Sequence, residues 1–333
     1  MKVAVFSSKT WDEESLGHAG SQSPLRFSFL PSRLTRDTVH LAAGHEAVCL
    51  FVNDEADTRI LHALSDLGIR IIALRCAGFN RVDLAAAEAL HLSLVRVPEY
   101  SPQAVAEHAL ALILTLNRHT HRAWNRVREG NFDLTGLMGF DLGGKTVGII
   151  GTGRIGRAFA HCLSGFGSRL LGMDPQENGE FAQQVGLQYT SLSTLLTESD
   201  VVSLHCPLTP ETNHLINEHT LSKMKATSML INTGRGALVD TPAVTQALKD
   251  QRLGSLGIDV YEEESELFFE DHSSEILQDD HLARLLTLPN VLVTGHQGFF
   301  THEAIQSIAE TTVNSLLALH SGSLPAPSCR IEA

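Results

Sequence analysis

The sequence predicts an α/β protein built from two doubly wound, parallel-sheet domains with a cleft between them. Three observations support this fold class. Short apolar segments alternate with helical patterns in both halves of the chain, as in βαβ units. A glycine-rich loop follows a buried strand near the middle of the sequence. The length of 333 residues suggests two domains, at roughly 150 residues for each.

The first hundred residues contain four apolar segments that predict strands, and amphipathic sequence separates them. Residues 61–67 have a helical pattern. Pro98 and Pro102 then interrupt the chain, so we place a domain boundary at residues 98–102. The four predicted strands are residues 3–6, 47–52, 69–74 and 94–97.

A long helix is predicted from about residue 103 to residue 126, because this stretch contains no glycine or proline. Its middle, residues 109–116, is apolar almost all round. A helix that is apolar on every side must bury its whole surface, so we expect it to lie between domains or subunits.

The second half of the chain repeats the strand–helix alternation. A buried strand at residues 145–150 leads directly into the sequence GTGRIG, and an amphipathic helix follows to about Phe166. A last helix is predicted at residues 303–319. The further predicted strands are residues 170–173, 201–204, 228–232, 255–260 and 291–294.

The GTGRIG loop has the context of a Rossmann-type dinucleotide-binding fingerprint: a strand precedes it, a helix follows it, and an acidic residue ends the next strand. The first glycine allows a tight turn, the second allows close approach of a pyrophosphate, and the third lets helix and strand pack. Free N–H groups of the helix N-terminus attract phosphate. The predicted cofactor-binding residues here are Gly151, Gly153, Arg154, Ile155, Gly156 and Asp174.

Asp174 selects the cofactor. A carboxylate at this position accepts hydrogen bonds from the ribose hydroxyls of NAD and repels the 2′-phosphate of NADP. Residues 175–178 contain no Arg or Lys to bind that phosphate. The sequence therefore favours NAD.

Charge and cysteine content exclude several classes of protein. The net charge is −13, and nine acidic residues lie in residues 262–280, which we expect to be a solvated surface segment. An acidic chain is not attracted to nucleic acid or to anionic lipid. Five cysteines without a CxxC pair predict neither a disulfide framework nor a metal site. With no apolar run of membrane-spanning length, we expect a cytoplasmic protein.

Polar residues follow three predicted strands of the second half, where parallel sheets place their ligands. The segments are 232–240 with Arg235, 257–264 with a run of carboxylates, and 294–298 with His296. In the first half, residues 76–79 follow a strand, and their N–H groups can form a small anion-binding nest.

At these positions the chain resembles the D-2-hydroxyacid dehydrogenases. The strings GTGRIG, HCPLTPET, INTGRGALVD, GIDVYEEE and TGHQGF match the family's motifs in order. Further strings, among them LRCAGFNRVDL, VAEHALALILTLNR, LFFED and LQDD, resemble the family's bacterial D-lactate dehydrogenase branch, found in fermenting enteric bacteria. The acidic segment then becomes an insertion typical of that branch.

The resemblance implies the catalytic roles. Arg235 binds the carboxylate of the 2-keto acid and polarises its carbonyl, a task that suits the rigid guanidinium fork. His296 is the acid/base, and Glu264 orients its ring and keeps it protonated, although Glu262 and Glu263 are close enough in sequence to be confused with it. Contacts with the cofactor are expected from Cys206, Pro207, Thr233, Gly234 and Asp259. Substrate contacts are expected from Arg235, Ala77, Gly78, Tyr100 and Phe299.

The expected reaction is the reversible reduction of pyruvate to D-lactate by NADH, with the D configuration implied by the resemblance alone. Residues 1–101 with 299–333 form the predicted substrate domain, and residues 102–298 the NAD-binding domain. The resemblance also implies a homodimer or homotetramer in which the long helix near residue 103 contacts a second subunit. Two alternatives stay open: a dehydrogenase for a larger 2-keto acid, and an NAD-sensing regulatory protein of the same fold.

Overall fold

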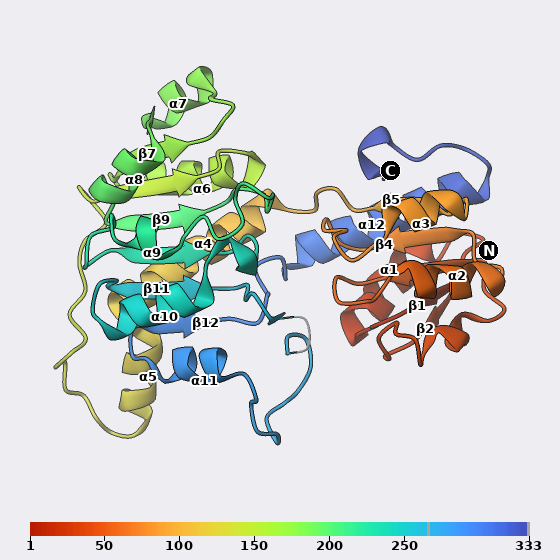
Figure 1. Ribbon diagram of the computed structural model, residues 1–333, viewed down its shortest axis with the longest axis horizontal. Helices are drawn as coiled ribbons and strands as arrows, with labels where there is room; N and C mark the ends of the chain where they lie inside the picture. Colours follow the sequence, from red (N-terminus) through yellow and green to blue (C-terminus); the bar gives the residue numbers. More distant parts are fainter. Residues whose placement is uncertain (265–266, 332–333) are drawn as a thin grey trace. The chain divides into compact units, whose positions relative to one another are not determined.

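The chain forms two compact units in the computed structural model, which describes residues 1–264 and 267–331. One unit contains Met1–Ser101 and Phe299–Ala333, and the other contains Pro102–Gly298. Each has a parallel sheet with helices packed on both faces (Figure 1). The predicted fold class of two doubly wound parallel-sheet domains is confirmed.

The first unit has five parallel strands in the order β2-β1-β3-β4-β5, which is the flavodoxin-like arrangement. Alternate residues of a strand face opposite sides, so β1 buries Val3 and Val5 on one face and Ala4 on the other. The strands are β1 (Lys2–Val5), β2 (Arg26–Phe29), β3 (Ala47–Leu50), β4 (Ile71–Leu74) and β5 (Ser93–Arg96).

The two faces of this sheet are covered by different helices. The N-terminal helix α1 (Thr10–Gly20) and the C-terminal helix α12 (His302–His320) pack together over the Val3 and Val5 face. Helices α2 (Thr58–Asp66) and α3 (Leu84–Ala89) cover the other face. The two ends of the chain therefore share one hydrophobic core.

The second unit has seven parallel strands in the order β12-β11-β10-β9-β6-β7-β8. The sequence runs outward in one direction from β6 to β8 and in the other from β9 to β12, which makes a switch point between β6 and β9. The strands are β6 (Thr146–Ile150), β7 (Arg169–Met173), β8 (Leu187–Tyr189), β9 (Val201–Leu204), β10 (Met229–Asn232), β11 (Ser255–Ile258) and β12 (Val291–Val293).

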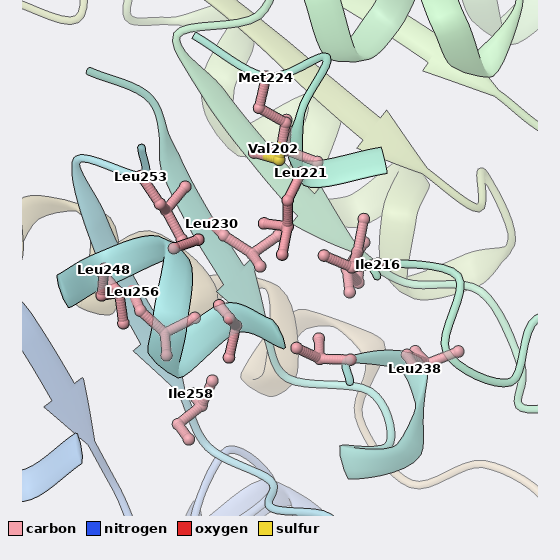
Figure 2. Close-up of a cluster of buried hydrophobic side chains, with 14 of the residues drawn as sticks. Val202, Ile216, Leu221, Met224, Leu230, Leu238, Leu248, Leu253, Leu256 and Ile258 are labelled. Atoms are coloured by element: carbon pink, nitrogen blue, oxygen red, sulfur yellow. The ribbon is translucent and has the colours of Figure 1, made fainter. Parts of the chain in front are cut away.

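Figure 2 shows the larger apolar cluster on one face of this sheet, where Val202, Leu230 and Leu256 from three neighbouring strands meet side chains of the covering helices. Helices α4 (Pro102–Arg118) and α6 (Arg154–Ser164) pack on the opposite face. The other helices of the unit are α5 (Thr120–Arg128), α7 (Gly179–Val185), α8 (Leu192–Glu198), α9 (Glu218–Leu221), α10 (Thr241–Lys249) and α11 (Asp280–Thr287).

The long helix predicted over residues 103–126 is two helices, and the prediction of one was wrong. His119, between α4 and α5, has a φ of +50°, a left-handed conformation that ends the helical hydrogen-bond ladder without a glycine or proline to signal it. One side of α4 is buried within its own unit, and the predicted burial between domains or subunits stays a prediction. Apolar residues of α4, such as Leu112 and Ile113, pack against α6 and the sheet of their own unit.

Two strands escaped the sequence prediction, and both lie at sheet edges. β2 and β8 each have one neighbouring strand, and their sequences, RFSF and LQY, are too short for their alternation to predict a strand. Pairing with β1 and β7 fixes them as strands, so their structure depends on tertiary context. No helix within the described residues is long and apolar enough to span a bilayer.

A buried guanidinium ties together the loops of the first unit. The Arg75 side chain, which is 1% exposed, donates from Nε to Asp12 Oδ1 at 2.9 Å and from Nη2 to the Ser7 carbonyl oxygen at 2.8 Å. Its guanidinium carbon also lies 4.9 Å from the centre of the Phe51 ring. An ion pair of the same length, Arg36–Asp57 at 2.9 Å, lies on the surface.

We predict that Arg75→Met lowers the free energy of unfolding by about 3–5 kcal/mol, because it leaves the Asp12 carboxylate buried without its partner. Arg36→Met is the matched control and should lose little free energy of unfolding, since water solvates both Arg36 and Asp57. Urea unfolding followed by Trp11 fluorescence, in a Trp124→Phe background, measures both variants. Equal losses would contradict the argument from burial.

Candidate active site

The carboxyl ends of the parallel strands in the second unit gather most of the predicted site residues at one edge of the sheet. The glycine loop follows β6, Asp174 follows β7, and Cys206 lies just beyond β9. The Thr233–Arg235 segment follows β10, and Asp259 follows β11. In an open α/β sheet, this edge next to the switch point is where ligands bind.

The glycine loop is shaped by close backbone approaches. Gly151 has a φ of +90°, and a Cβ there would lie 2.5 Å from the backbone nitrogen of Cys206. A Cβ on Gly156 would overlap the carbonyl oxygen of Gly151. Gly153 differs, because no atom lies within 4 Å of the position a Cβ would take. The first and third glycines therefore serve the protein's own packing, whereas the second leaves open space.

Helix α6 begins directly after Gly153, and no side chain caps its first turn. Arg154 is exposed and Ile155 is half-buried. The N–H groups at a helix N-terminus have no partner within the helix. The open space beside Gly153 thus lies next to uncapped donors and the positive end of the helix dipole, a combination that suits a phosphate group.

Asp174 connects the glycine loop to the end of β7. Its Oδ2 accepts a hydrogen bond from the Thr152 backbone N–H at 2.6 Å, and its Oδ1 accepts one from the Gln176 N–H at 2.8 Å. The Thr152 hydroxyl lies 2.9 Å from that of Tyr189. Each carboxylate oxygen retains lone pairs for a ligand hydroxyl.

His205 and Cys206 lie behind the glycine loop. The His205 ring packs against Phe159 at 4.8 Å between ring centres, and its Nε2 lies 2.9 Å from the Ser203 hydroxyl. Burial lowers the pKa of His205 to about 3 and raises the pKa of the Cys206 thiol to about 11. Both side chains are therefore neutral at pH 7, while the neighbouring Pro207 is exposed.

The Asn232 side chain folds the loop that carries Arg235. Its Nδ2 donates to the Arg235 carbonyl oxygen at 2.9 Å, and its Oδ1 accepts from the Gly234 N–H at 3.1 Å. Arg235 is half-buried and donates from Nη1 to the Gly234 carbonyl oxygen at 2.7 Å. The hydroxyl of Thr233 is buried and has no hydrogen-bond partner within the described chain.

His296 and Glu264 form a direct pair. The imidazole Nδ1 lies 2.9 Å from Glu264 Oε1, and the other carboxylate oxygen accepts from the Tyr261 backbone N–H at 3.0 Å. Each side chain is 17% exposed. Since an ionised carboxylate can only accept, Nδ1 carries a proton, and Nε2 is the ring nitrogen whose protonation can change.

The structure separates the three consecutive glutamates. Glu262 pairs with His214, with 2.5 Å between Oε1 and Nε2, and the Glu263 side chain is exposed. Only Glu264 contacts His296 among the three. The acidic segment is thus partly surface and partly structural, since Asp279 accepts a hydrogen bond from the Tyr261 hydroxyl at 2.7 Å. Residues 265 and 266 lie outside the described residues.

Asp259 holds the turn that presents His296. Its buried carboxylate accepts hydrogen bonds from the Thr294 hydroxyl at 2.6 Å and from the backbone N–H groups of Gln297 and Gly298 at 2.9 and 2.8 Å. The Asp259 carbonyl oxygen accepts from the His296 N–H at 2.7 Å. These bonds offset the strained φ of +55° at His296.

His108, on helix α4, adds to this network with its Nε2 3.1 Å from Asp259 Oδ1. Burial raises the pKa of Asp259, but hydrogen bonds from His108 and Thr294 outweigh it, and the net pKa lies below the usual range. The predicted contact of Asp259 with the cofactor stays a prediction.

The remaining predicted substrate residues belong to the first unit. Ala77 and Gly78 lie in the loop after β4 and are half-buried. Tyr100 and Phe299 contact each other edge to face with 6.0 Å between ring centres, and Phe51 lies 6.3 Å from Phe299. They form an aromatic cluster within that unit.

Comparisons with known proteins support one family. The pattern of "D-isomer specific 2-hydroxyacid dehydrogenase, NAD binding domain" matches residues 110–298. The chain is 51% identical to the D-lactate dehydrogenase of Escherichia coli (strain K12) over 97% of this chain and 98% of the relative. The solved apo-structure of D-lactate dehydrogenase from Escherichia coli has a TM-score of 0.90 at 48% identity, covering 98% of this chain and 99% of that one. The pyruvate reductase of Chlamydomonas reinhardtii has a TM-score of 0.93 at 41% identity, with 98% of each chain covered.

The chain belongs to the D-isomer specific 2-hydroxyacid dehydrogenase family. It is an oxidoreductase, and its second unit contains the family's NAD-binding domain. The predicted family and the predicted cofactor, NAD, are confirmed.

The residues present fit the cofactor of a D-isomer specific 2-hydroxyacid dehydrogenase. The open space beside Gly153 and the uncapped start of α6 suit the pyrophosphate, and Asp174 suits the adenosine ribose. The buried, unpartnered hydroxyl of Thr233 is a polar group that a bound cofactor would satisfy. Within the described residues, no three His, Cys, Asp or Glu side chains are placed to hold a metal ion.

Sequence reasoning gave no role to three residues that shape this site: His108, Asn232 and Thr294. Each carries a signal that could have been found. His108 directly precedes the apolar middle of α4, Asn232 is the polar last residue of a buried strand, and Thr294 directly precedes the Gly295-His296 turn.

We predict that Gly153→Ala weakens NADH binding by about tenfold or more without changing stability, because its methyl group enters space that only the cofactor fills. Gly156→Ala is the contrasting control: it forces Gly151 to move and so lowers both stability and NADH affinity. Fluorescence titration with NADH and thermal unfolding measure both effects. Wild-type affinity in Gly153→Ala would contradict the assignment of the pyrophosphate site.

Proposed function

We propose that the protein is an NAD-dependent D-lactate dehydrogenase that reversibly reduces pyruvate to D-lactate with NADH. The pair of His296 and Glu264, on the edge of the NAD-binding sheet that also presents Arg235, is the observation that carries the proposal. The full-length similarity to D-lactate dehydrogenases supports this substrate.

Arg235 binds the substrate carboxylate and polarises the keto group in this mechanism. A guanidinium suits both tasks because its planar fork donates several charge-assisted hydrogen bonds. The Asn232 bonds to both sides of the loop hold the Arg235 backbone in place. We also assign the backbone N–H groups of Ala77 and Gly78 to the carboxylate, and Tyr100 and Phe299 to the apolar part of the substrate.

His296 supplies the proton. Glu264 keeps one proton on Nδ1, so Nε2 donates to the carbonyl oxygen in the reduction of pyruvate and accepts a proton in the oxidation of D-lactate. The nicotinamide, when bound, supplies the hydride. Asp259 holds the His296 turn in position through the bonds to Gln297 and Gly298.

We assign the cofactor contacts to residues at the carboxyl ends of the strands in the second unit. We assign the pyrophosphate to the loop of Gly151, Gly153, Arg154, Ile155 and Gly156, and the ribose hydroxyls to Asp174. The backbone of Cys206 lies beside this loop, and we assign Cys206 and the following Pro207 to the nucleoside. Thr233, Gly234 and Asp259 follow the strands further along and are assigned to the nicotinamide end.

We further propose that the protein is a cytoplasmic homo-oligomer, a dimer or tetramer. All five cysteines are free thiols, which favours a reducing compartment. Helix α5 has no buried residue, and the segment that follows it exposes more apolar side chains. This apolar arm comprises Trp124, Val127, Phe132, Leu134 and Met138, each more than half exposed. A second copy covering the arm would remove this surface from water.

The enzymatic proposal is tested by the loss of NADH absorbance with pyruvate and a panel of larger 2-keto acids, followed by chiral analysis of the product. Glu264→Gln should lower turnover with pyruvate, toward the roughly 10²–10⁴-fold loss expected for His296→Gln, because the ring loses its charged partner. Glu263→Gln is the matched control and should retain wild-type turnover, since this side chain is exposed. Wild-type turnover in Glu264→Gln would refute the role of Glu264. A preference for a larger 2-keto acid would refute pyruvate as the proposed substrate.

The oligomer is tested by light scattering at micromolar protein concentration. We predict a dimer or tetramer for the wild type and a smaller species for the double variant Phe132→Glu, Leu134→Glu, because buried carboxylates would oppose association. Ile276→Glu, at an apolar residue that is 83% exposed elsewhere in the same unit, is the control and should keep the wild-type mass. A monomeric wild type would rule out the proposal.

A further inference from the structure

Three backbone N–H groups of the loop after β4 have no acceptor in the described part of the chain. Among the residues that the structure describes, no hydrogen bond satisfies the N–H of Ala77, Gly78 or Phe79. These residues are half-buried and lie at the carboxyl end of a parallel strand. Because adjacent backbone N–H groups without a protein acceptor can form an anion-binding nest, this row of N–H groups suits an anionic ligand.

A side chain from the neighbouring strand holds this loop. β4 and β5 pair in parallel with Leu74 opposite Arg96, so Arg96 stands beside the chain just where it leaves β4. Arg96 Nη1 donates to the Ala77 carbonyl oxygen at 2.8 Å, and the guanidinium carbon lies 4.9 Å from the centre of the Phe79 ring. Arg96 thus fixes one peptide group and one side chain of the loop at once.

The contact with Ala77 has a consequence for the next N–H group. In a trans peptide, the C=O and the N–H point in opposite directions, and the chain contains no cis peptide within its described residues. When Arg96 binds the Ala77 carbonyl oxygen, the N–H of Gly78 must point away from Arg96. Cys76 holds the next peptide group in the same way, since its thiol donates to the Gly78 carbonyl oxygen with 3.2 Å between Sγ and O.

The same contact strengthens the Gly78 donor. A cation bound to the carbonyl end of a peptide polarises that peptide and makes its N–H a better hydrogen-bond donor. The guanidinium over the Phe79 ring is a second contact, which opposes rotation of the loop about the first. A lysine would supply the charge but neither the fork nor the plane.

We propose that Arg96 is a positioning residue for substrate: it aims the Gly78 N–H at the carboxylate of the 2-keto acid. The inference rests on the proposed function and deepens it, because it assigns the orientation of the carboxylate-binding loop to a residue on the neighbouring strand. The reacting groups Arg235, Glu264 and His296 belong to the second unit, so loss of Arg96 should affect binding of the acid more than the chemical step.

Three variants test the proposal. Arg96→Met removes the donor and the charge, Arg96→Lys keeps the charge without the fork, and Arg70→Met is the matched control. Arg70 lies at the amino end of β4 and also donates to backbone carbonyl oxygens, those of Ser65 and Ile69. Steady-state kinetics give KM for pyruvate and kcat, fluorescence gives the Kd for NADH, and calorimetry gives the Kd for pyruvate on the NAD⁺-saturated protein.

Arg96→Met should raise KM and the calorimetric Kd for pyruvate by about tenfold or more, as for the loss of a well-placed hydrogen bond to a charged group. Arg96→Lys should lie between this variant and the wild type. For all three variants, kcat should stay within about threefold and the Kd for NADH should not change. Arg70→Met should match the wild type throughout. If Arg96→Met fails to fold, the rise expected in Arg96→Lys decides the test.

Two results would overturn the proposal: unchanged pyruvate affinity in the Arg96 variants, or a parallel loss of NADH affinity, which would indicate general damage. A different result would refute the proposed function itself. A wild-type protein that binds pyruvate on its NAD⁺ complex without oxidising NADH in its presence would refute the activity, while the calorimetric comparison would still decide the role of Arg96. A wild type that binds no pyruvate would overturn both.

Discussion

One buried carboxylate organises the carboxyl edge of the sheet in the second unit. Asp259 is 1% exposed, yet it accepts hydrogen bonds from a hydroxyl, an imidazole and two backbone N–H groups. A buried charge is costly unless it is fully bonded, so these partners have little freedom to move. The turn that carries His296 is held by these bonds, and the imidazole is therefore kept pointing toward Glu264.

Close packing of backbone adds a second constraint to the same edge. A Cβ on Gly236 would overlap the backbone of Tyr261, so the loops after β10 and β11 are in direct contact. Tyr261 in turn donates its N–H to Glu264 and its hydroxyl to Asp279. The loop of Arg235 and the carboxylate that faces His296 are therefore linked through one backbone contact.

Much of this arrangement could be predicted from the sequence because its signals are local. Apolar runs predicted the central strands, and the spacing of Gly151, Gly153 and Gly156 before an acidic strand end predicted the glycine loop. The edge strands β2 and β8 and the break at His119 carried no comparable signal, because neighbouring strands or a single backbone angle determine them. Likewise, the choice among Glu262, Glu263 and Glu264 depends on side-chain direction, which only the folded chain fixes.

The pairing of α1 with α12 sets the order in which the molecule can be completed during synthesis. Val3 and Val5 share a core with Ala309 and Val313, more than 300 residues later in the chain. The second unit is continuous in sequence and can close as soon as it has emerged from the ribosome. Helix α1 covers only part of this face, so the first unit must keep the rest of it uncovered until the last helix arrives. A nascent chain stalled before α12 would therefore expose that face, which makes it a natural target for chaperones that bind apolar surfaces.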